Sequence, residues 1–100
     1  MRAVLALLIA IAPAAAGERQ PAPGRYCSQG IDLPEVSIGP EPGTAGIDLM
    51  DCTKVKIAHG RLRSPSCYGM GGALVPYDVD LVVEADGTLL HDGARYRRCP

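Results

Sequence analysis

Residues 52–67, CTKVKIAHGRLRSPSC, decide the fold. The two cysteines at the ends of this stretch lie at equal distances from the step His59-Gly60, which is the best turn signal between them. A hairpin that turns at this step places Cys52 and Cys67 opposite each other on neighbouring strands. We therefore predict a disulfide between them.

Pro65 constrains how this hairpin turns, because it has no N–H to donate to a ladder. A two-residue turn at His59-Gly60 would give Pro65 and the cysteine pair hydrogen-bonded positions. A four-residue loop, Ala58 to Arg61, moves them to non-hydrogen-bonded positions. The sequence therefore favours that loop, or an equivalent bulge near Pro65.

Cys27 and Cys99 are the other two of the four cysteines. An even number of cysteines in an exported chain indicates disulfides, and pairing these two ties the first expected strand to the last. Zinc is the competing interpretation, but zinc ligands usually include close pairs such as C-x-x-C, and the gaps here are 25, 15 and 32 residues. We predict two disulfides, no metal site and no free catalytic thiol.

The rest of the chain has the pattern of short strands. Apolar and polar residues alternate, or follow strong turns, over residues 35–39, 47–57, 77–84, 88–91 and 94–99. Asp86-Gly87 and Asp92-Gly93 are strong hairpin signals, and no window has helical periodicity. We predict an all-β fold: a small antiparallel sheet or barrel of about six or seven strands, held by two disulfides.

The N-terminus is typical of an export signal. A positively charged start precedes an apolar run, and small residues up to Ala16 predict cleavage after that residue. The run is too short for a membrane-spanning helix, and Gly17 after the cut is not the cysteine that lipid attachment needs. We expect a periplasmic or secreted protein without a membrane span, divided into a signal peptide (1–16), a flexible leader (17–24) and one disulfide-stabilised β domain (25–100).

Charge and motifs restrict the function. The formal net charge is −1, which argues against a nucleic-acid partner because such domains are normally basic. His59 is expected in a turn and His91 at a strand end, and neither has partners at the spacing of a catalytic triad. Asp78 and Asp80 share a strand face but lack the spacing of a calcium loop. We expect no catalytic residue, no cofactor and no metal; a small hydrolase or metal-dependent enzyme is a minor alternative.

The C-terminal stretch DGARYRRCP, residues 92–100, holds the candidate binding residues. On a strand, its arginines project to both faces, with Arg95 and Arg97 on the face opposite to Tyr96. In one interpretation the arginines are solvated and discourage edge-to-edge pairing, while Tyr96 packs inward and Cys99 locks the chain end. In the other, they are part of a basic patch for an anionic partner. The candidate patch consists of Arg95, Tyr96, Arg97, Arg98, Arg61 and Arg63.

Two resemblances bear on function. ADGTLL (85–90) and YRRC (96–99), together with the interior cysteines, resemble small four-cysteine exported proteins of Gram-negative bacteria with a dG-x-L hairpin and a final Y-x-R-C. This resemblance implies a periplasmic β domain and no particular activity.

DGARY (92–96) resembles the SGxxY motif of the periplasmic inhibitors of c-type lysozyme, small β-barrels whose motif loop enters the lysozyme active site. It implies an inhibitor in which Gly93 and Tyr96 contact the enzyme. The chain departs from this motif at Asp92, where the family has Ser, and it lacks a counterpart of the family's Tyr and Lys motif.

We therefore expect an exported, non-enzymatic binding or accessory protein of the bacterial envelope. Its partner is expected to be an envelope or secreted protein, or an anionic envelope component. The alternative is an inhibitor of a secreted hydrolase such as c-type lysozyme. The sequence leaves the oligomeric state and the identity of the partner open.

Overall fold

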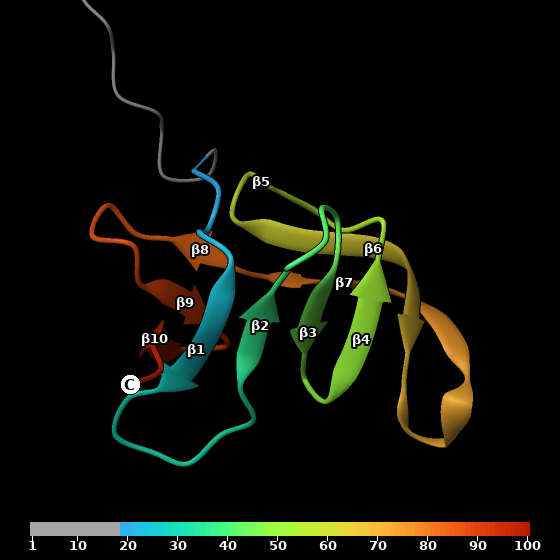
Figure 1. The fold of residues 1–100 in the computed structure, drawn as a ribbon, viewed down its shortest axis with the longest axis horizontal. Helices are drawn as coiled ribbons and strands as arrows, with labels where there is room; N and C mark the ends of the chain where they lie inside the picture. Colours follow the sequence, from blue (N-terminus) through green and yellow to red (C-terminus); the bar gives the residue numbers. More distant parts are fainter. Residues whose placement is uncertain (1–18) are drawn as a thin grey trace, which may run out of the picture.

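The computed structural model describes residues 19–100, apart from the side chain of Met70, and is all-β (Figure 1). The expected signal peptide lies outside the described residues. The elements are β1 Gly24–Ser28, β2 Val36–Ile38, β3 Ala45–Ile47, β4 Met50–Thr53, β5 Lys56–Ala58, β6 Arg61–Tyr68, the short 3-10 turn η3 Met70–Gly72, β7 Leu74–Asp80, β8 Val82–Val83, β9 Leu89–His91 and β10 Ala94–Arg98. The predicted β fold is confirmed, although its ten strands are shorter and more numerous than expected.

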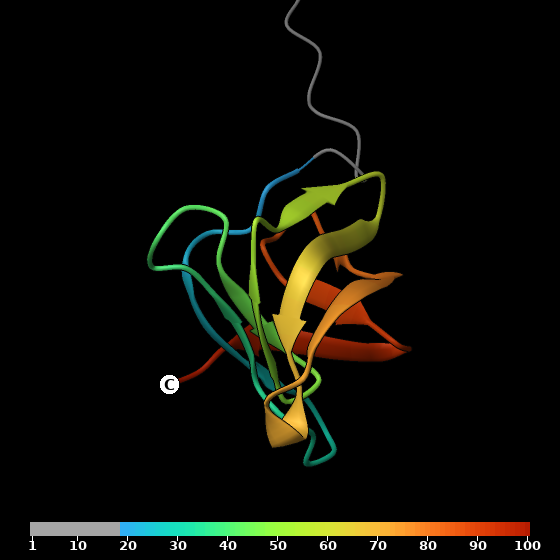
Figure 2. The same ribbon diagram turned by 90° about the vertical axis from the view of Figure 1, so that its right-hand side faces the viewer.

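The strands form one curled antiparallel sheet, a half-barrel, in the order β5-β6-β4-β3-β2-β1-β10-β9-β8, with β7 paired to β6 (Figures 1 and 2). The chain runs from β7 through Leu81 into β8, so it connects the two ends of the sheet. Leu81 N donates to Gly60 O at 2.9 Å, and Asp92 N donates to Oδ2 of Asp80 at 2.8 Å. The half-barrel is thus closed by the chain itself and by polar contacts across the seam between β7 and β9.

The stretch 47–57, which we predicted as one strand, is divided among β3, β4 and β5. Asp48 and Leu49 have φ values of 52° and 67° and turn the chain between β3 and β4. Lys54, with φ 53°, interrupts the strand between β4 and β5. Burial changes phase at each break, since Ile47 and Ile57 are buried at odd positions and Cys52 at an even one. None of the three turn residues is glycine, so the usual sequence signal for these breaks is missing.

The central hairpin confirms the predicted cysteine pairing. Cys52 lies opposite Cys67 in the β4–β6 ladder, and the two form a disulfide. Their Cα atoms are 4.0 Å apart, close to the spacing of a non-hydrogen-bonded pair.

Of the two predicted alternatives, the four-residue loop is wrong, because Ala58 pairs with Arg61 and leaves a two-residue turn. The other alternative, an irregularity near Pro65, is confirmed. The ladder is instead interrupted opposite Pro65, since β4 ends at Thr53 and β5 begins at Lys56. A bulge between Ser64 and Cys67 also shifts the register between β6 and β7. Both irregularities accommodate the missing N–H of Pro65.

The core is small and includes the buried Cys52–Cys67 disulfide. Its largest fully buried side chains come from inward positions of the strands and from the link between β7 and β8: Tyr26, Ile47, Leu62, Leu81, Leu89, Val36, Cys52 and Cys67. The chain has no Phe and no Trp to enlarge this core. The second disulfide, Cys27–Cys99, ties β1 to the residue after β10, and these two strands are neighbours in the sheet. The predicted connection of the first strand to the last is confirmed.

The last residues of the expected leader contact the sheet. β1 begins at Gly24, and Pro21 is already buried. Gln20 Nε2 donates to Ile57 O at 2.6 Å, and Tyr26 Oη donates to Ala22 O at 2.6 Å. The segment from Gln20 onward therefore packs on the sheet, because a buried proline ring and two hydrogen bonds hold it there. None of the described residues belongs to a helix that is long and apolar enough to cross a membrane.

Candidate binding site

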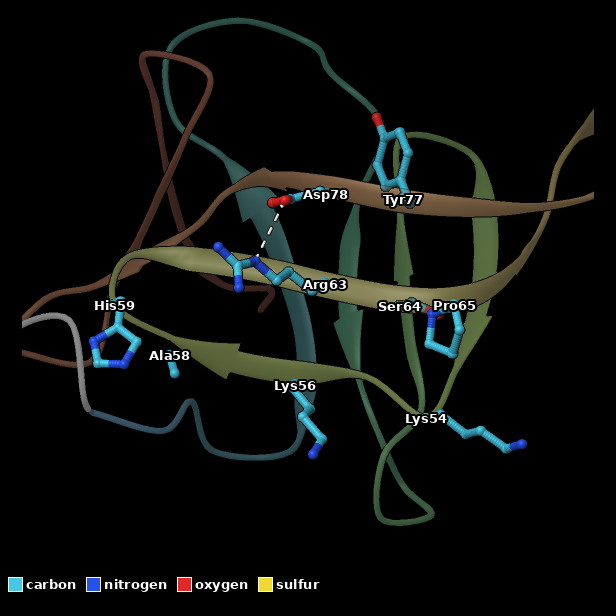
Figure 3. A pocket seen from close by; sticks show the side chains of 9 residues that line it. All are labelled: Lys54, Lys56, Ala58, His59, Arg63, Ser64, Pro65, Tyr77 and Asp78. Carbon is cyan, nitrogen blue, oxygen red and sulfur yellow. Dashed lines mark ion pairs between the residues drawn. The ribbon is translucent and has the colours of Figure 1, made fainter.

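A hollow of about 610 Å³ opens over β5, β6 and β7 at one end of the half-barrel (Figure 3). We call it the basic hollow. It is lined by Lys54, Lys56, Ala58, His59, Arg63, Ser64, Pro65, Tyr77 and Asp78. Its size is that of a small-molecule or peptide subsite.

The register of the central hairpin builds the rim of the basic hollow. Lys56 lies opposite Arg63, and Arg63 lies opposite Asp78, so these three side chains form a row across β5, β6 and β7. Lys54 stands at the break between β4 and β5, where the ladder is interrupted. The two lysines, the only ones in the chain, therefore lie at this one site.

Asp78 is the only acidic residue that lines the basic hollow. Its Oδ1 lies 2.8 Å from Arg61 Nε, and its Oδ2 lies 3.3 Å from Arg63 Nε. The hydrogen bond from Arg61, with the charges of both arginines, holds the pKa of the Asp78 carboxyl below its usual value. The single carboxylate of the lining is thus paired with arginines, and the charges of Lys54 and Lys56 leave the rim positive.

The titratable groups of the basic hollow do not converge on one point. In Figure 3 the side chains of Lys54 and Lys56 point away from each other, and His59 lies at the far end of the hairpin. Only Arg63 and Asp78 face each other, as an ion pair. General acid–base or nucleophilic chemistry needs two or more groups within hydrogen-bond reach of a common point. The arrangement is suited to holding separated negative charges.

The expected basic patch is divided between two parts of the sheet. Arg61 and Arg63 lie on β6, whereas the C-terminal arginines lie on β10, between β1 and β9. The guanidinium of Arg98 lies 5.6 Å from the centroid of the Tyr26 ring. Arg95 Nη1 donates to Thr88 Oγ1 at 3.4 Å, and Arg97 is exposed opposite Cys27. The structure therefore brings Arg61 and Arg63 together with the lysines, and separates them from the β10 arginines.

Tyr96, one of the expected binding residues, points into the core. Its side chain is 3 % exposed, and its ring centroid lies 6.3 Å from that of His91. Gly93 occupies a two-residue turn between β9 and β10 with φ 79°. Alternation along β10 turns Tyr96 inward when Arg95 and Arg97 face outward, and its role as a binding residue stays a prediction.

His91 is the buried member of a polar cluster that the sequence did not reveal. Its side chain is 4 % exposed; Nδ1 lies 2.7 Å from Asp80 O and Nε2 lies 2.9 Å from Asp48 Oδ1. Tyr77 Oη donates to the other oxygen of Asp48. Asp48 and His91 are 43 residues apart, so no local motif could have predicted this cluster.

The pKa values of the cluster follow from these contacts. Burial alone would lower the pKa of His91, but the bonds to Asp48 and to the Asp80 carbonyl, with the charges of both carboxylates, raise it overall. Burial would raise the pKa of Asp48, but its bonds with Tyr77 and His91 lower it overall. Burial and the bond to Asp48 raise the pKa of Tyr77 to about 12. The cluster is therefore a charged pair with a neutral tyrosine.

One cluster of possible metal ligands occurs among residues 19–100, formed by Cys27, Glu35 and Cys99. Its two sulfurs are bonded to each other, so neither is the thiolate that zinc binds. Glu35 forms an ion pair with Arg25 at 2.6 Å. This cluster is a disulfide next to a surface ion pair.

Comparison of the chain with models of known protein families finds no match, and comparisons with curated proteins and with solved structures find none either.

Proposed function

We propose that this chain is an exported, non-enzymatic binding or accessory protein of the bacterial envelope, and that the basic hollow engages an anionic partner. The two disulfides support export, because such bonds form and persist in oxidising compartments. The observation that carries the proposal is the row of exposed cations around the basic hollow, which contains both lysines of the chain and a single acid.

The spacing of the cations favours an extended partner. Lys54, Lys56 and Arg63 are exposed and diverge from one another, so one compact anion would not touch all three (Figure 3). A flexible segment that carries several negative charges meets them in turn, while Ala58 and Pro65 supply an apolar floor. The partner class is therefore an acidic polymer or an acidic protein segment.

The alternatives receive less support from the geometry. An inhibitor of the lysozyme type would use Tyr96, whose ring is packed in the core. A hydrolase would need converging titratable groups, whereas those of the basic hollow diverge. Such groups do converge in the cluster of His91, Asp48 and Tyr77, but there they are bonded to one another. We retain the binding protein as the conclusion.

The test compares two sets of cations that carry the same charge. One variant replaces Lys54, Lys56 and Arg63 with Gln, and the control replaces Arg95, Arg97 and Arg98 with Gln. Binding of fluorescent poly-glutamate and of polyphosphate is measured by anisotropy at several salt concentrations, since exposed charge pairs weaken with screening. Because each exposed pair contributes about twofold to threefold in affinity, the first variant should lose roughly tenfold and the control far less.

Each probe has a distinct meaning. Preference for poly-glutamate would indicate an acidic protein segment, and preference for polyphosphate would indicate a phosphate-bearing envelope component. Equal losses in the two variants would mean that net charge alone governs binding and would refute the assignment to the basic hollow. A greater loss of affinity in the variant with replaced β10 arginines would show that the partner binds at the C-terminal arginines.

A further inference from the structure

Three connections at the end of the half-barrel opposite β5 carry exposed apolar side chains. They are the β1–β2 loop, the β3–β4 turn and the β6–β7 connection, and both ribbon views place them at the same end (Figures 1 and 2). Outside the side chain of Met70, every large hydrophobic residue that is exposed in the described chain lies on or beside them: Ile31, Leu33, Leu49, Tyr68, Leu74 and Val75. We call this surface the apolar end. Soluble monomers rarely gather their exposed apolar residues in this way unless the patch is an interaction site.

The apolar end is continuous across the strands. Tyr68 lies opposite Asp51 on one side and opposite Leu74 on the other, so the three form a row across β4, β6 and β7. A hollow of about 420 Å³ connects the β1–β2 loop to the β3–β4 turn; its lining contains Pro34 and Leu49 beside the carboxylates of Glu35 and Asp51. The surface is therefore a band with a recess and not three isolated side chains.

Leu49 is the strongest sign that this band is functional. Three two-residue turns join neighbouring strands with both turn residues at positive φ: Asp48-Leu49, His59-Gly60 and Asp92-Gly93. Such turns favour glycine in the second position, and the other two have it. Leu49 adopts φ 67° with a side chain that is 67 % exposed, so it is strained and contributes nothing to the core. A strained and exposed leucine is explained if its side chain contacts a partner.

The charges of the apolar end indicate the kind of partner. Residues 29–35, 48–51 and 68–75 contain Asp32, Glu35, Asp48 and Asp51 and no Lys, Arg or His. Glu35 is paired with Arg25 and Asp48 with His91, so the net negative charge of this surface comes from Asp32 and Asp51. Both lysines lie at the opposite end, around the basic hollow. An anionic membrane would be repelled by this surface, whereas a protein with basic side chains around an apolar contact would be attracted.

We propose that the apolar end docks a basic protein segment with apolar side chains that fit between the three connections. This surface is separate from the basic hollow and takes a partner of the opposite charge. The chain would then join two partners, an anionic one at β5–β7 and a basic one at the apolar end. Leu49 and Tyr68 are the central contacts of the second surface.

A displayed library of random peptides tests this proposal on the full chain, processed by an exporting host. The selected peptides should combine aliphatic or aromatic residues with Lys or Arg. Leu49→Gly should weaken their binding at least about tenfold, as expected for a central interface contact, and should also raise Tm by roughly 4–8 °C because the turn strain is relieved. Tyr68→Ser should weaken binding without raising Tm. Glu41→Gln, an exposed change elsewhere, is the control that keeps binding.

Several results would overturn the proposal. Peptides that bind the Leu49→Gly and Tyr68→Ser variants as well as the parent would show that the apolar end takes no part. Self-association of the parent that Leu49→Gly abolishes in sedimentation experiments would make a second copy the occupant, and binding to zwitterionic vesicles would make it a bilayer. Poly-glutamate binding should be unchanged in the Leu49→Gly variant, so failure of this proposal is distinguishable from failure of the basic hollow.

Discussion

Nε2 of His91 lies 2.9 Å from Oδ1 of Asp48, while Nδ1 of the same ring lies 2.7 Å from the carbonyl oxygen of Asp80. Both neighbours are hydrogen-bond acceptors, so the ring must carry a proton on each nitrogen to satisfy them. The seam between β7 and β9 and the turn between β3 and β4 are thus held by an imidazolium. His91 connects the protonation of one side chain to the closure of the half-barrel.

The free energy of unfolding should decrease as the pH rises. The pKa of His91 is raised above its unfolded value of 6.5, so its contribution is complete below pH 6.5 and is lost as the pH rises through the folded pKa. Each unit of difference between the two pKa values is worth about 1.4 kcal/mol. Urea denaturation from pH 5.5 to about 9 measures this loss, at roughly half-unit steps. The His91→Gln variant should be less stable than the parent at low pH, and its free energy of unfolding should change little across this pH range. The His59→Gln variant, at an exposed position, should follow the parent. A parent whose stability is constant over this range would contradict the imidazolium.

Removal of the Tyr77 hydroxyl should change how the free energy of unfolding depends on pH in the acid range. The pKa of Asp48 is lowered by Tyr77 and His91, so its stabilising contribution is present above the unfolded value of 3.8 and is lost as the pH falls through the folded pKa. Tyr77→Phe removes one of these bonds, and acid unfolding should therefore begin at a higher pH. Tyr68→Phe, at an exposed tyrosine, is the matched control. Coincident acid transitions for parent and Tyr77→Phe would show that the bond to Asp48 has no effect on its pKa.

Tyr26→Phe should release the segment before β1. The buried hydroxyl donates to Ala22 O at 2.6 Å, and its loss should destabilise the fold by about 1 kcal/mol. Amide hydrogen exchange should then become faster at residues 20–24, while the β4–β6 ladder keeps its protection. Unchanged exchange in that segment would indicate that Pro21 and Gln20 hold it without the tyrosine.

Loss of the Cys27–Cys99 bond should be far more destabilising than loss of a nearby charge. The bond closes a separation of 72 residues, which the chain-entropy model values at about 4 kcal/mol. Cys27→Ser with Cys99→Ser should therefore lower Tm greatly, whereas Arg97→Ala, at an exposed position opposite Cys27, should change it little. Peptide mapping without reduction should link Cys27 to Cys99 and Cys52 to Cys67. Similar Tm losses in the two variants would contradict the structural role of the bond.

The features that were predictable from the sequence depend on local turns. The His59-Gly60 step fixed the register that places Cys52 opposite Cys67, because a tight turn determines every pair in its ladder. The same register brings Lys56 opposite Arg63, so part of the basic hollow could have been found from the hairpin alone.

The features that were not predictable depend on unusual backbone or on distant contacts. The Asp48-Leu49 turn could not be recognised, because leucine occupies the second turn position, where glycine is normally found. The contact between His91 and Asp48 joins residues from opposite halves of the chain, and only the curl of the sheet brings them together. The inward direction of Tyr96 was one of the two interpretations of β10, and the structure selects it.

The Cys27–Cys99 bond also determines how the molecule would respond to a pulling force. Because it joins a residue of the first strand to one that follows the last, nearly the whole β domain is enclosed in a covalent ring. A force applied between the two chain ends passes through the sulfur atoms and bypasses the hydrogen-bonded ladders. In an optical trap, the oxidised protein should extend only by the residues outside this ring, and reduction should release the remainder as added contour length.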